Sequence, residues 1–358
     1  ERIGLSGTNL SFAENEGGKV ESIPFNATEY VATVALFLDW LREQDGMQSV
    51  ETVGHRVVHG MKHTQPEVVT QKLLEELHRI STYDPAHLPG EIELMEAFRK
   101  QYPKLTQVAC FDTAFHHSMP RVAKLLPIPW RYEAMGLKRY GFHGLSYAYL
   151  MHELKRVDPV AAQGRVILAH LGNGASLAAV IHGKSIDTSM GFTPTSGMMM
   201  STRSGDLDPG LVNFLARTEN MTPAHFDHLA NHESGLLGLS GTSSDMRDLL
   251  ELEKKDARAA DAVDLFCYQT KKWIGSFAAA LGGLETLIFS GGIGENSPSI
   301  RERICDGLGF LGVELDPSRN AINAELITSD AGRVAGRVFR TDEELMIARS
   351  VNRLLEVK

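Results

Sequence analysis

The sequence predicts an α/β protein with two domains, and three observations support this. The chain has 358 residues, which is too long for one small core and suits about two domains. Apolar strands alternate with amphipathic helices in both halves, which is compatible with a duplicated α/β domain. Glycine-rich turns follow two of the strands, where the backbone can approach a bound phosphate closely.

Composition narrows the class of protein. A net charge of -9 argues against nucleic-acid binding, because phosphate backbones need a basic face. The three cysteines are far apart and odd in number, so we expect reduced thiols rather than a disulfide framework. No stretch approaches the ~20 apolar residues of a membrane span, and no signal peptide is recognised. We therefore expect a cytoplasmic protein that binds no membrane.

The first residues predict part of a β-meander. The chain begins Glu1-Arg2-Ile3-Gly4 without an initiator Met, so we expect a missing N-terminal segment. Residues 28–44 carry apolar side chains at helical spacing and predict an amphipathic helix.

Residues 53–60 predict a strand bracketed by glycines, with Arg56 inside its β-branched run. Burying a guanidinium is costly unless it meets an anion. An anion site and an edge strand with Arg56 in solvent are equally compatible with this pattern.

Two helices are expected at 67–81 and 90–101, followed by a buried strand at 107–111. Asp112 comes directly after this strand, where α/β enzymes commonly place catalytic groups. The alternative is that Asp112 caps a short helical turn. Next, the segment 138–147 sets His143 between two glycines and close to Arg139, which favours an anion site over a structural histidine, before a helix at 145–157.

The stretch 165–209 is the centre of the predicted site. The sequence His-Leu-Gly-Asn-Gly lies between strands expected at 166–168 and 176–181, and a third strand ends at Ile186. A run of hydroxyl residues and glycines around Arg203 follows. Hydroxyls and backbone N–H groups donate to phosphate oxygens, and arginine binds them with two nitrogens. An ordinary polar loop is the alternative.

The remaining elements alternate in the same way. Helices are expected at 207–219, 223–232 and 257–281, and strands at 287–289 and 337–340. Residues 243–248 open a further helix, so Asp245 either caps it or contacts a nucleotide. The Gly-Gly-x-Gly turn at 291–294 lies between a strand and a helix and is a second phosphate-loop candidate. The last helix starts at 341–344 with acids that suit its N-terminus or magnesium.

Together these blocks resemble the acetate kinase family, also called the acetate/propionate kinases. Nine motifs occur in family order and span nearly the whole chain. They are GHRVVHG at 54–60, FDTAFH at 111–116, RYGFHG at 139–144, HLGNG at 170–174, DTSMGFTP at 187–194, TRSGDLDP at 202–209, ESGLLGL at 233–239, GGIGEN at 291–296 and TDEELMIA at 341–348. Each motif is weak alone, but nine in order are specific.

The resemblance implies the duplicated actin-like fold of the sugar kinases, with two α/β domains flanking a cleft and a homodimeric assembly. The domains would be residues 1–113 plus 345–358, and residues 114–344. It also implies reversible phosphoryl transfer from ATP to acetate, giving acetyl phosphate and ADP by direct in-line attack of the carboxylate. Magnesium, or manganese in its place, would be required.

The resemblance further implies a role for each matched residue. Asp112, His143 and Arg203 would be catalytic: Asp112 near the metal, His143 as a donor to the transition state, and Arg203 on the transferring group. Arg56 would bind the carboxylate, and Glu343, with Glu344 less favoured, would support the metal. Three residues would line the pocket for the methyl group: Val58, Phe142 and Pro194. The nucleotide would be held by a larger set: His170, Leu171, Gly172, Asn173, Gly174, Asp245, Met246, Arg247, Gly292, Ile293, Gly294, Glu295 and Asn296.

The sequence departs from the family pattern in two segments. The family begins with a glycine- and serine-rich hairpin bearing an Asn and a Lys, which this sequence lacks. The family usually reads Pro-Leu-His-Asn before a proline, whereas this chain has Ser81-Thr82-Tyr83-Asp84. Tyr83 can donate a hydrogen bond but cannot carry positive charge near neutral pH.

Alternative functions follow from these departures. One is a kinase of propionate or another short carboxylic acid, which the polar Thr82 would favour. Another is a non-catalytic relative that binds nucleotide. A sugar kinase is disfavoured, because a hydroxyl acceptor needs a base and has no use for paired arginines.

Overall fold

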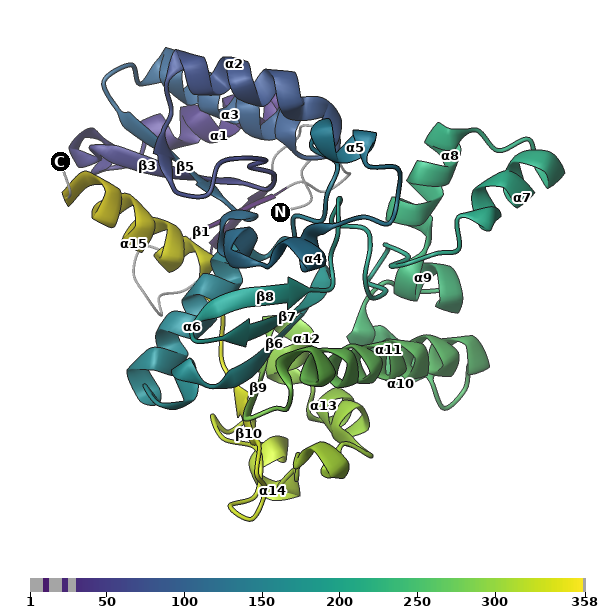
Figure 1. The fold of residues 1–358 in the computed structure, drawn as a ribbon. Coiled ribbons are helices and arrows are strands. Elements are labelled where there is room, and N and C mark those ends of the chain that lie inside the picture. The colour runs from purple at the N-terminus through teal and green to yellow at the C-terminus, as the bar shows by residue number, and fades with distance from the viewer. Residues whose placement is uncertain (1–8, 13–20, 25–29, 357–358) are drawn as a thin grey trace. The chain divides into compact units, whose positions relative to one another are not determined.

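The computed structural model describes residues 9–12, 21–24 and 30–356 of the chain. The chain divides into two compact units: unit 1 is Glu1–Phe111 with Ile347–Lys358, and unit 2 is Asp112–Met346. It passes from unit 2 back into unit 1 within helix α15, Glu343–Glu356 (Figure 1). Asp112 therefore opens unit 2. The domain boundaries expected after residues 113 and 344 stay a prediction beside this division.

Unit 1 contains a three-stranded sheet in the order β3-β5-β4. Strands β3 (Thr52–Val57) and β5 (Thr106–Phe111) are parallel, and β4 (Glu67–Val68) pairs antiparallel with β5. Helices α1 (Tyr30–Arg42) and α3 (Leu88–Gln101) bury Val34, Leu38 and Phe98 in one cluster. A separate antiparallel pair is formed by β1 (Asn9–Phe12) and β2 (Glu21–Pro24). The other residues of the expected N-terminal meander lie outside the described ones.

The expected helix at 67–81 is wrong at its start. Residues 67–68 join the sheet, and the amide of Val69 donates to the carbonyl oxygen of Gln107 on the neighbouring strand. Helix α2 (Gln71–Ile80) begins only after Thr70, whose Oγ1 accepts from the amide of Leu73 at 3.2 Å. The sheet therefore takes up the residues before this N-cap, and the apolar spacing alone could not show that.

Unit 2 is built on a five-stranded sheet with the order β10-β9-β6-β7-β8. The strands are β6 (Arg165–Leu171), β7 (Ala175–Ile181), β8 (Lys184–Thr188), β9 (Thr286–Ser290) and β10 (Ala335–Val338). Strand β6 is parallel to β9 and antiparallel to β7. Because His170 is in register with Ser290, the loops that follow β6 and β9 leave the same edge of the sheet.

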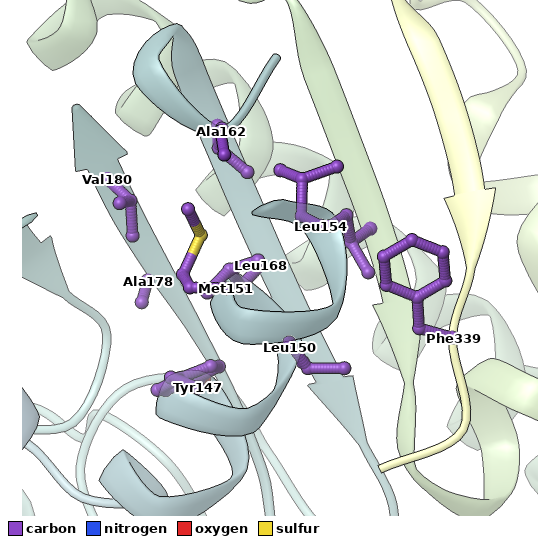
Figure 2. Packing of buried hydrophobic residues seen from close by; sticks show 11 residues of the cluster. Tyr147, Leu150, Met151, Leu154, Ala162, Leu168, Ala178, Val180 and Phe339 are labelled. Carbon is purple, nitrogen blue, oxygen red and sulfur yellow. The ribbon is translucent and has the colours of Figure 1, made fainter. Parts of the chain in front are cut away.

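Helix α6 (Gly144–Val157) covers one face of this sheet. Its residues Tyr147, Leu150, Met151 and Leu154 point onto the strands and are buried there (Figure 2). The long helix α11 (Ala257–Leu281) packs on β6 and β7 from the other side. Side chains of a strand alternate between faces, so the near-continuous apolar runs of β6 and β7 supply both layers.

The expected helices at 207–219 and 223–232 are both shorter in the structure. Helix α7 (Gly210–Thr218) begins only after Pro209, whose ring disfavours a helical backbone at the residue before it. Helix α8 (Pro223–His228) runs into a π-helical turn, Leu229–Glu233. The other short helices of unit 2 are α4 (Arg121–Lys124), α5 (Arg131–Ala134), α9 (Gly235–Ser240), α10 (Met246–Leu252), α12 (Gly291–Asn296), α13 (Pro298–Cys305) and α14 (Pro317–Ala321).

Within the described ranges, no helix has the length and apolar character needed to cross a membrane.

Replacing Leu154 by alanine should destabilise unit 2. Leu154 is fully buried between α6 and the sheet, so the change removes buried methyl groups and leaves a cavity. We expect the free energy of unfolding to fall by about 3 kcal/mol, measured by urea denaturation. Val160 is 84% exposed, so Val160→Ala should change it by less than about 0.5 kcal/mol. Equal losses for the two variants would contradict the packing described here.

Candidate functional site

Asp112 follows directly on strand β5 and lies at the entry to helix α6. Its side chain is fully buried. A Cβ on Gly144, the first residue of α6, would overlap the carbonyl oxygen of Asp112, so only glycine allows this approach. Thr113 holds the N-cap position of the following 3-10 turn, one residue after Asp112. The catalytic role of Asp112 and the capping alternative both stay predictions.

His143 is the N-cap of α6 and has a left-handed backbone, with φ of 57°. This conformation is uncommon for a residue with a side chain and is characteristic of functional sites. The ring is 9% exposed, and its Nδ1 lies 2.9 Å from Ser176 Oγ. It stacks on the ring of His170 with centroids 4.4 Å apart. The backbone turn thus places His143 beside the loop that follows β6.

Phe142, expected in the acceptor pocket, is held by a buried histidine. His116 Nε2 lies 2.9 Å from the carbonyl oxygen of Phe142, and His116 Nδ1 lies 2.9 Å from Ser185 Oγ. Burial lowers the pKa of His116 to about 4, against the opposing effect of the Phe142 hydrogen bond. The ring is therefore neutral at pH 7, with Nε2–H donating to Phe142 and Nδ1 accepting from Ser185.

Arg203 and His143 meet at Gly174, the last residue of the loop after β6. A Cβ on Gly174 would lie 3.1 Å from His143 Nε2 and 3.6 Å from Arg203 Nη1. The backbone around Arg203 is tied to the same loop, because the amide of Ser201 donates to the carbonyl oxygen of Asn173 at 3.1 Å. Pro194 is buried, and its carbonyl oxygen lies 3.4 Å from Arg203 Nη1. A nitrogen of each side chain thus approaches one point beside the glycine loop.

A cavity of about 730 Å³ opens in unit 2 next to this point. Eight of the residues expected to bind nucleotide line it: Gly172, Asn173, Asp245, Met246, Arg247, Gly292, Ile293 and Asn296. The other four lining residues are Ser201 and Ser244, which lie in segments singled out from the sequence, and Leu250 and Ser297, which were missed. Leu250 could have been found, because it lies four residues after Met246 on the same face of α10. The volume lies within the usual range for small-molecule sites.

The other residues expected at the nucleotide support this cavity from outside. Leu171 is fully buried, and His170 Nδ1 lies 2.9 Å from Ser146 Oγ. Glu295 Oε1 accepts from the amides of Gly291 at 2.9 Å and Thr341 at 3.0 Å. This carboxylate therefore connects the turn after β9 to the segment that leads into α15.

Arg301 was not anticipated from the sequence. Its side chain is fully buried and donates to the carbonyl oxygens of Gly294 and Glu295 at 2.8 and 3.0 Å. It also donates to Asn320 and Asn323. Arg301 therefore satisfies carbonyls at the end of α12, where the helix has no partners of its own. An isolated arginine in a helical sequence gives no signal of this role.

Asp245 caps helix α10 and also lines the cavity, and its contact with a nucleotide stays a prediction. Its Oδ1 accepts from the amide of Arg247 at 2.8 Å and so caps α10. Its side chain also pairs with the Arg247 guanidinium, which lowers the pKa of Asp245. Both residues line the cavity.

Arg56 and Val58 belong to unit 1. Arg56 is exposed on β3 between the buried His55 and Val57, as strand alternation requires. The amide of Val58 donates to the Glu91 carboxylate, and Val58 is 6% exposed.

The departure from the family pattern at 81–84 also lies in unit 1. Thr82 is exposed, whereas Tyr83 is partly buried with its ring centroid 6.5 Å from that of His59. Asp84 is 4% exposed, and its Oδ1 lies 2.8 Å from His87 Nδ1.

The donor set of unit 2 fits magnesium. Asp112 is fully buried, and Glu343 is partly buried in the first turn of α15, where Asp342 caps the helix by accepting from the amide of Leu345. Glu343 acts electrostatically on Tyr147 of α6, and the main chain of Asp112 lies against Gly144 at the start of the same helix. In the part of the chain that the structure describes, no three carboxylate, histidine or cysteine side chains form a metal cage. Magnesium in phosphoryl-transfer sites needs only one or two carboxylates with water and phosphate.

Comparisons with known proteins identify close relatives. The model of the acetokinase family matches residues 1–349. An acetate kinase from Rhodopseudomonas palustris (strain TIE-1) is 44% identical over 333 residues, covering 92% of this chain and 83% of the relative. A propionate kinase from Citrobacter rodentium (strain ICC168) is 43% identical over 362 residues, covering 99% and 89%.

Solved structures agree with this result. The acetate kinase of Porphyromonas gingivalis has a TM-score of 0.88 and 34% identity, covering 99% of this chain and 92% of that one. The propionate kinase of Francisella tularensis has a TM-score of 0.90 and 33% identity, covering 98% and 90%. The expected α/β fold of the actin-like type is thereby confirmed.

The buried His116 should make the stability of the protein depend on pH. Its pKa is about 4 in the folded chain and near its ordinary value of 6.5 when unfolded. As pH falls from about 6.5 to about 4, the unfolded chain binds a proton that the folded chain excludes, so stability is lost over this range. We expect His116→Gln to reduce the slope of the free energy of unfolding against pH by up to about 1.4 kcal/mol per unit.

Urea denaturation between about pH 7 and about pH 4.5 measures this slope. His225 is exposed, so His225→Gln should leave the slope unchanged. His55, whose pKa is also lowered to about 4 by burial, should preserve a residual slope in both variants. An unaltered slope in His116→Gln would contradict the assignment of a neutral, buried ring.

Proposed function

This chain belongs to the acetokinase family, and on that premise we propose that it is an acetate kinase. The reaction is magnesium-dependent, reversible transfer of a phosphoryl group from ATP to acetate, giving acetyl phosphate and ADP. One observation supports this most directly. His143 and Arg203 meet at Gly174, next to a cavity lined by the loops after β6 and β9.

The cavity suits a nucleotide. Its apolar lining residues Met246, Leu250 and Ile293 offer a surface for a purine ring. Gly172 and Gly292 also line it and present backbone without side chains, which lets phosphates approach amide groups. The hydroxyls of Ser201 and Ser244 add further donors. We therefore assign ATP and ADP to this cavity.

The transfer itself needs alignment and charge neutralisation. Acetate is ionised at neutral pH, so the nucleophile requires no general base. His143 Nε2 and Arg203 Nη1 would donate to the transferring phosphoryl group as charge develops on its oxygens. Arg56 would hold the acetate carboxylate. Asp112 and Glu343 would hold magnesium, which when bound neutralises charge on the phosphates.

From the family resemblance, Val58 of unit 1 and Phe142 and Pro194 of unit 2 would each face the methyl group of the acceptor. All three are buried and apolar, which suits the methyl group of a short acid. Propionate is the second candidate acceptor, because a relative 43% identical to this chain is a propionate kinase. A non-catalytic protein that only binds nucleotide is the third reading. The location of the protein in the cytoplasm stays a prediction.

Trapping acyl phosphate with hydroxylamine tests the function. The purified chain, and a version extended by the N-terminal hairpin of the family, are given Mg-ATP with acetate, propionate or butyrate in turn. We expect hydroxamate to form fastest with acetate. Faster product from propionate would move the assignment to a propionate kinase. Absence of product with both proteins, while ATP still binds, would leave a nucleotide-binding protein and overturn the proposal.

Arg203→Ala should lower turnover by a factor on the order of 10³, because it removes a cation that stabilises the transition state. Arg79 is exposed on α2 of unit 1, so Arg79→Ala serves as the matched control and should leave turnover unchanged. The hydroxamate assay at saturating acetate compares the three proteins. Turnover of Arg203→Ala within threefold of the parent would refute the role of Arg203.

We also propose that two copies of the chain associate through helix α7. In the part of the chain that the structure describes, α7 buries none of its residues, although Leu211, Val212 and Phe214 are apolar and 39%, 36% and 53% exposed. A nine-residue helix is marginal in water by itself, so it needs a covering surface. The homodimer implied by the family resemblance would supply one.

Light scattering after gel filtration should give twice the mass of the chain. Phe214→Asp would place a charge in the proposed interface and should shift the protein to monomer. Phe310 is 73% exposed on the turn after α13, and Phe310→Asp should remain dimeric. A monomeric parent protein, or a dimer that survives Phe214→Asp, would exclude this interface.

A further inference from the structure

We propose that Tyr147 and Ser176 are positioning residues that hold His143 as the tautomer protonated on Nε2. We assign this proton to a hydrogen bond with the transferring phosphoryl group, and that role rests on the proposed function. The tautomer itself rests on the buried hydrogen-bond geometry of unit 2.

Three side chains form a short chain of hydrogen bonds. Tyr147 Oη lies 2.5 Å from Ser176 Oγ, which in turn lies 2.9 Å from His143 Nδ1. Tyr147 and Ser176 are fully buried. They come from helix α6 and strand β7, which pack in the same core (Figure 2). Ser176 is in register with His170 on β6, and this explains why His143 both bonds to Ser176 and stacks on His170.

Counting protons decides between the two possible directions of this chain. If Tyr147 donates to Ser176 and Ser176 donates to His143 Nδ1, every hydroxyl proton has an acceptor and Nδ1 carries no proton. In the opposite direction, Nδ1–H donates to Ser176 and Ser176 donates to Tyr147. The phenol proton then needs another acceptor. If Ser176 instead accepted from both neighbours, its own hydroxyl proton would need another acceptor.

The described residues offer no further acceptor to either hydroxyl. Among the described residues, Ser176 Oγ is the one hydrogen-bond partner of Tyr147 Oη. Burial raises the pKa of Tyr147, so its phenol keeps its proton at neutral pH. A buried hydroxyl left without an acceptor costs about 1–3 kcal/mol. The first direction therefore prevails, and the single proton of a neutral His143 ring is on Nε2.

This nitrogen faces the proposed chemistry. A Cβ on Gly174 would lie 3.1 Å from His143 Nε2 and 3.6 Å from Arg203 Nη1. His143 and Arg203 thus present donors to the same small region. Stacking on His170 and bonding to Ser176 fix the ring plane, and Tyr147 fixes the direction of the Ser176 hydroxyl. These contacts thereby direct an N–H donor, rather than an acceptor nitrogen, at this region.

Nitrogen-15 NMR of the whole protein labelled at histidine tests the tautomer without any activity. The His143 signals are assigned by their loss in His143→Gln, since the chain has 14 histidines. We expect Nδ1 to resonate as an unprotonated nitrogen and Nε2 as a protonated one at neutral pH. A protonated Nδ1 in the parent protein would overturn the proposal.

Two variants test the positioning role. Ser176→Ala removes the donor to Nδ1 and should shift His143 toward a tautomer mixture, with kcat lowered about tenfold and the KM for ATP little changed. Tyr147→Phe removes the donor that sets the direction of Ser176 and should have a smaller effect of the same kind. Unchanged tautomer and unchanged kcat in both variants would overturn the proposal.

A matched control separates positioning from general loss of packing. Ser185 is also fully buried and lies at the same 2.9 Å from the Nδ1 of a histidine, His116. Ser185→Ala should cost similar stability but leave the NMR signature of His143 unchanged. Should Ser176→Ala fail to fold, the spectrum of the parent protein still decides the tautomer. If the parent protein shows Nε2–H but forms no acyl phosphate, the proposed tautomer would stand and the kinase assignment would be rejected.

Discussion

The pairing of strand β6 with its two neighbours is the constraint on which the site depends. On one side β6 runs parallel to β9, with His170 opposite Ser290, and on the other it runs antiparallel to β7, with His170 opposite Ser176. A parallel pair brings its carboxyl ends to one edge, so the loops after β6 and β9 share a cavity. The antiparallel pair places the Ser176 hydroxyl within hydrogen-bond distance of His143. A shift of one residue in either pairing would turn these side chains to the opposite face.

Around this edge, the backbone of glycine residues lines the cavity, and polar side chains support these loops from behind. Glycines 172, 174 and 292 form the surface of the loops, while Glu295 and Arg301 hold the turn after β9 from below. His116, a neutral buried ring, likewise supports the backbone of Phe142 by donating a hydrogen bond to its carbonyl oxygen. Groups that would otherwise be costly to bury are satisfied by carbonyls and hydroxyls. Precise loops of this kind need such a supporting layer, because glycine-rich backbone is intrinsically adaptable.

Much of the fold was predictable, because burial leaves a periodic pattern in the sequence. The apolar run of β6 and the spacing of α11 indicated a buried strand and a long amphipathic helix, and both were found where expected. The expected bounds were wrong where residues bond to a neighbouring element instead of continuing the predicted helix. Residues 67–68 joined the sheet through β5, and the end of α8 widened into a π turn. Local spacing cannot register a hydrogen bond made to a strand forty residues away.

Some features of the candidate site were likewise predictable from the sequence, and others required the structure. The sequence by itself determined the glycine loops, the acids and the arginines, because these residue types are required by phosphate and metal chemistry wherever they lie. Only the tertiary structure decided that Gly174 is the meeting point of His143 and Arg203, and that Glu295 points inward to Thr341. It alone showed that Tyr147 and Ser176 frame a histidine. These relations join residues about thirty or more positions apart, so they exist only once strands, helices and loops are packed together.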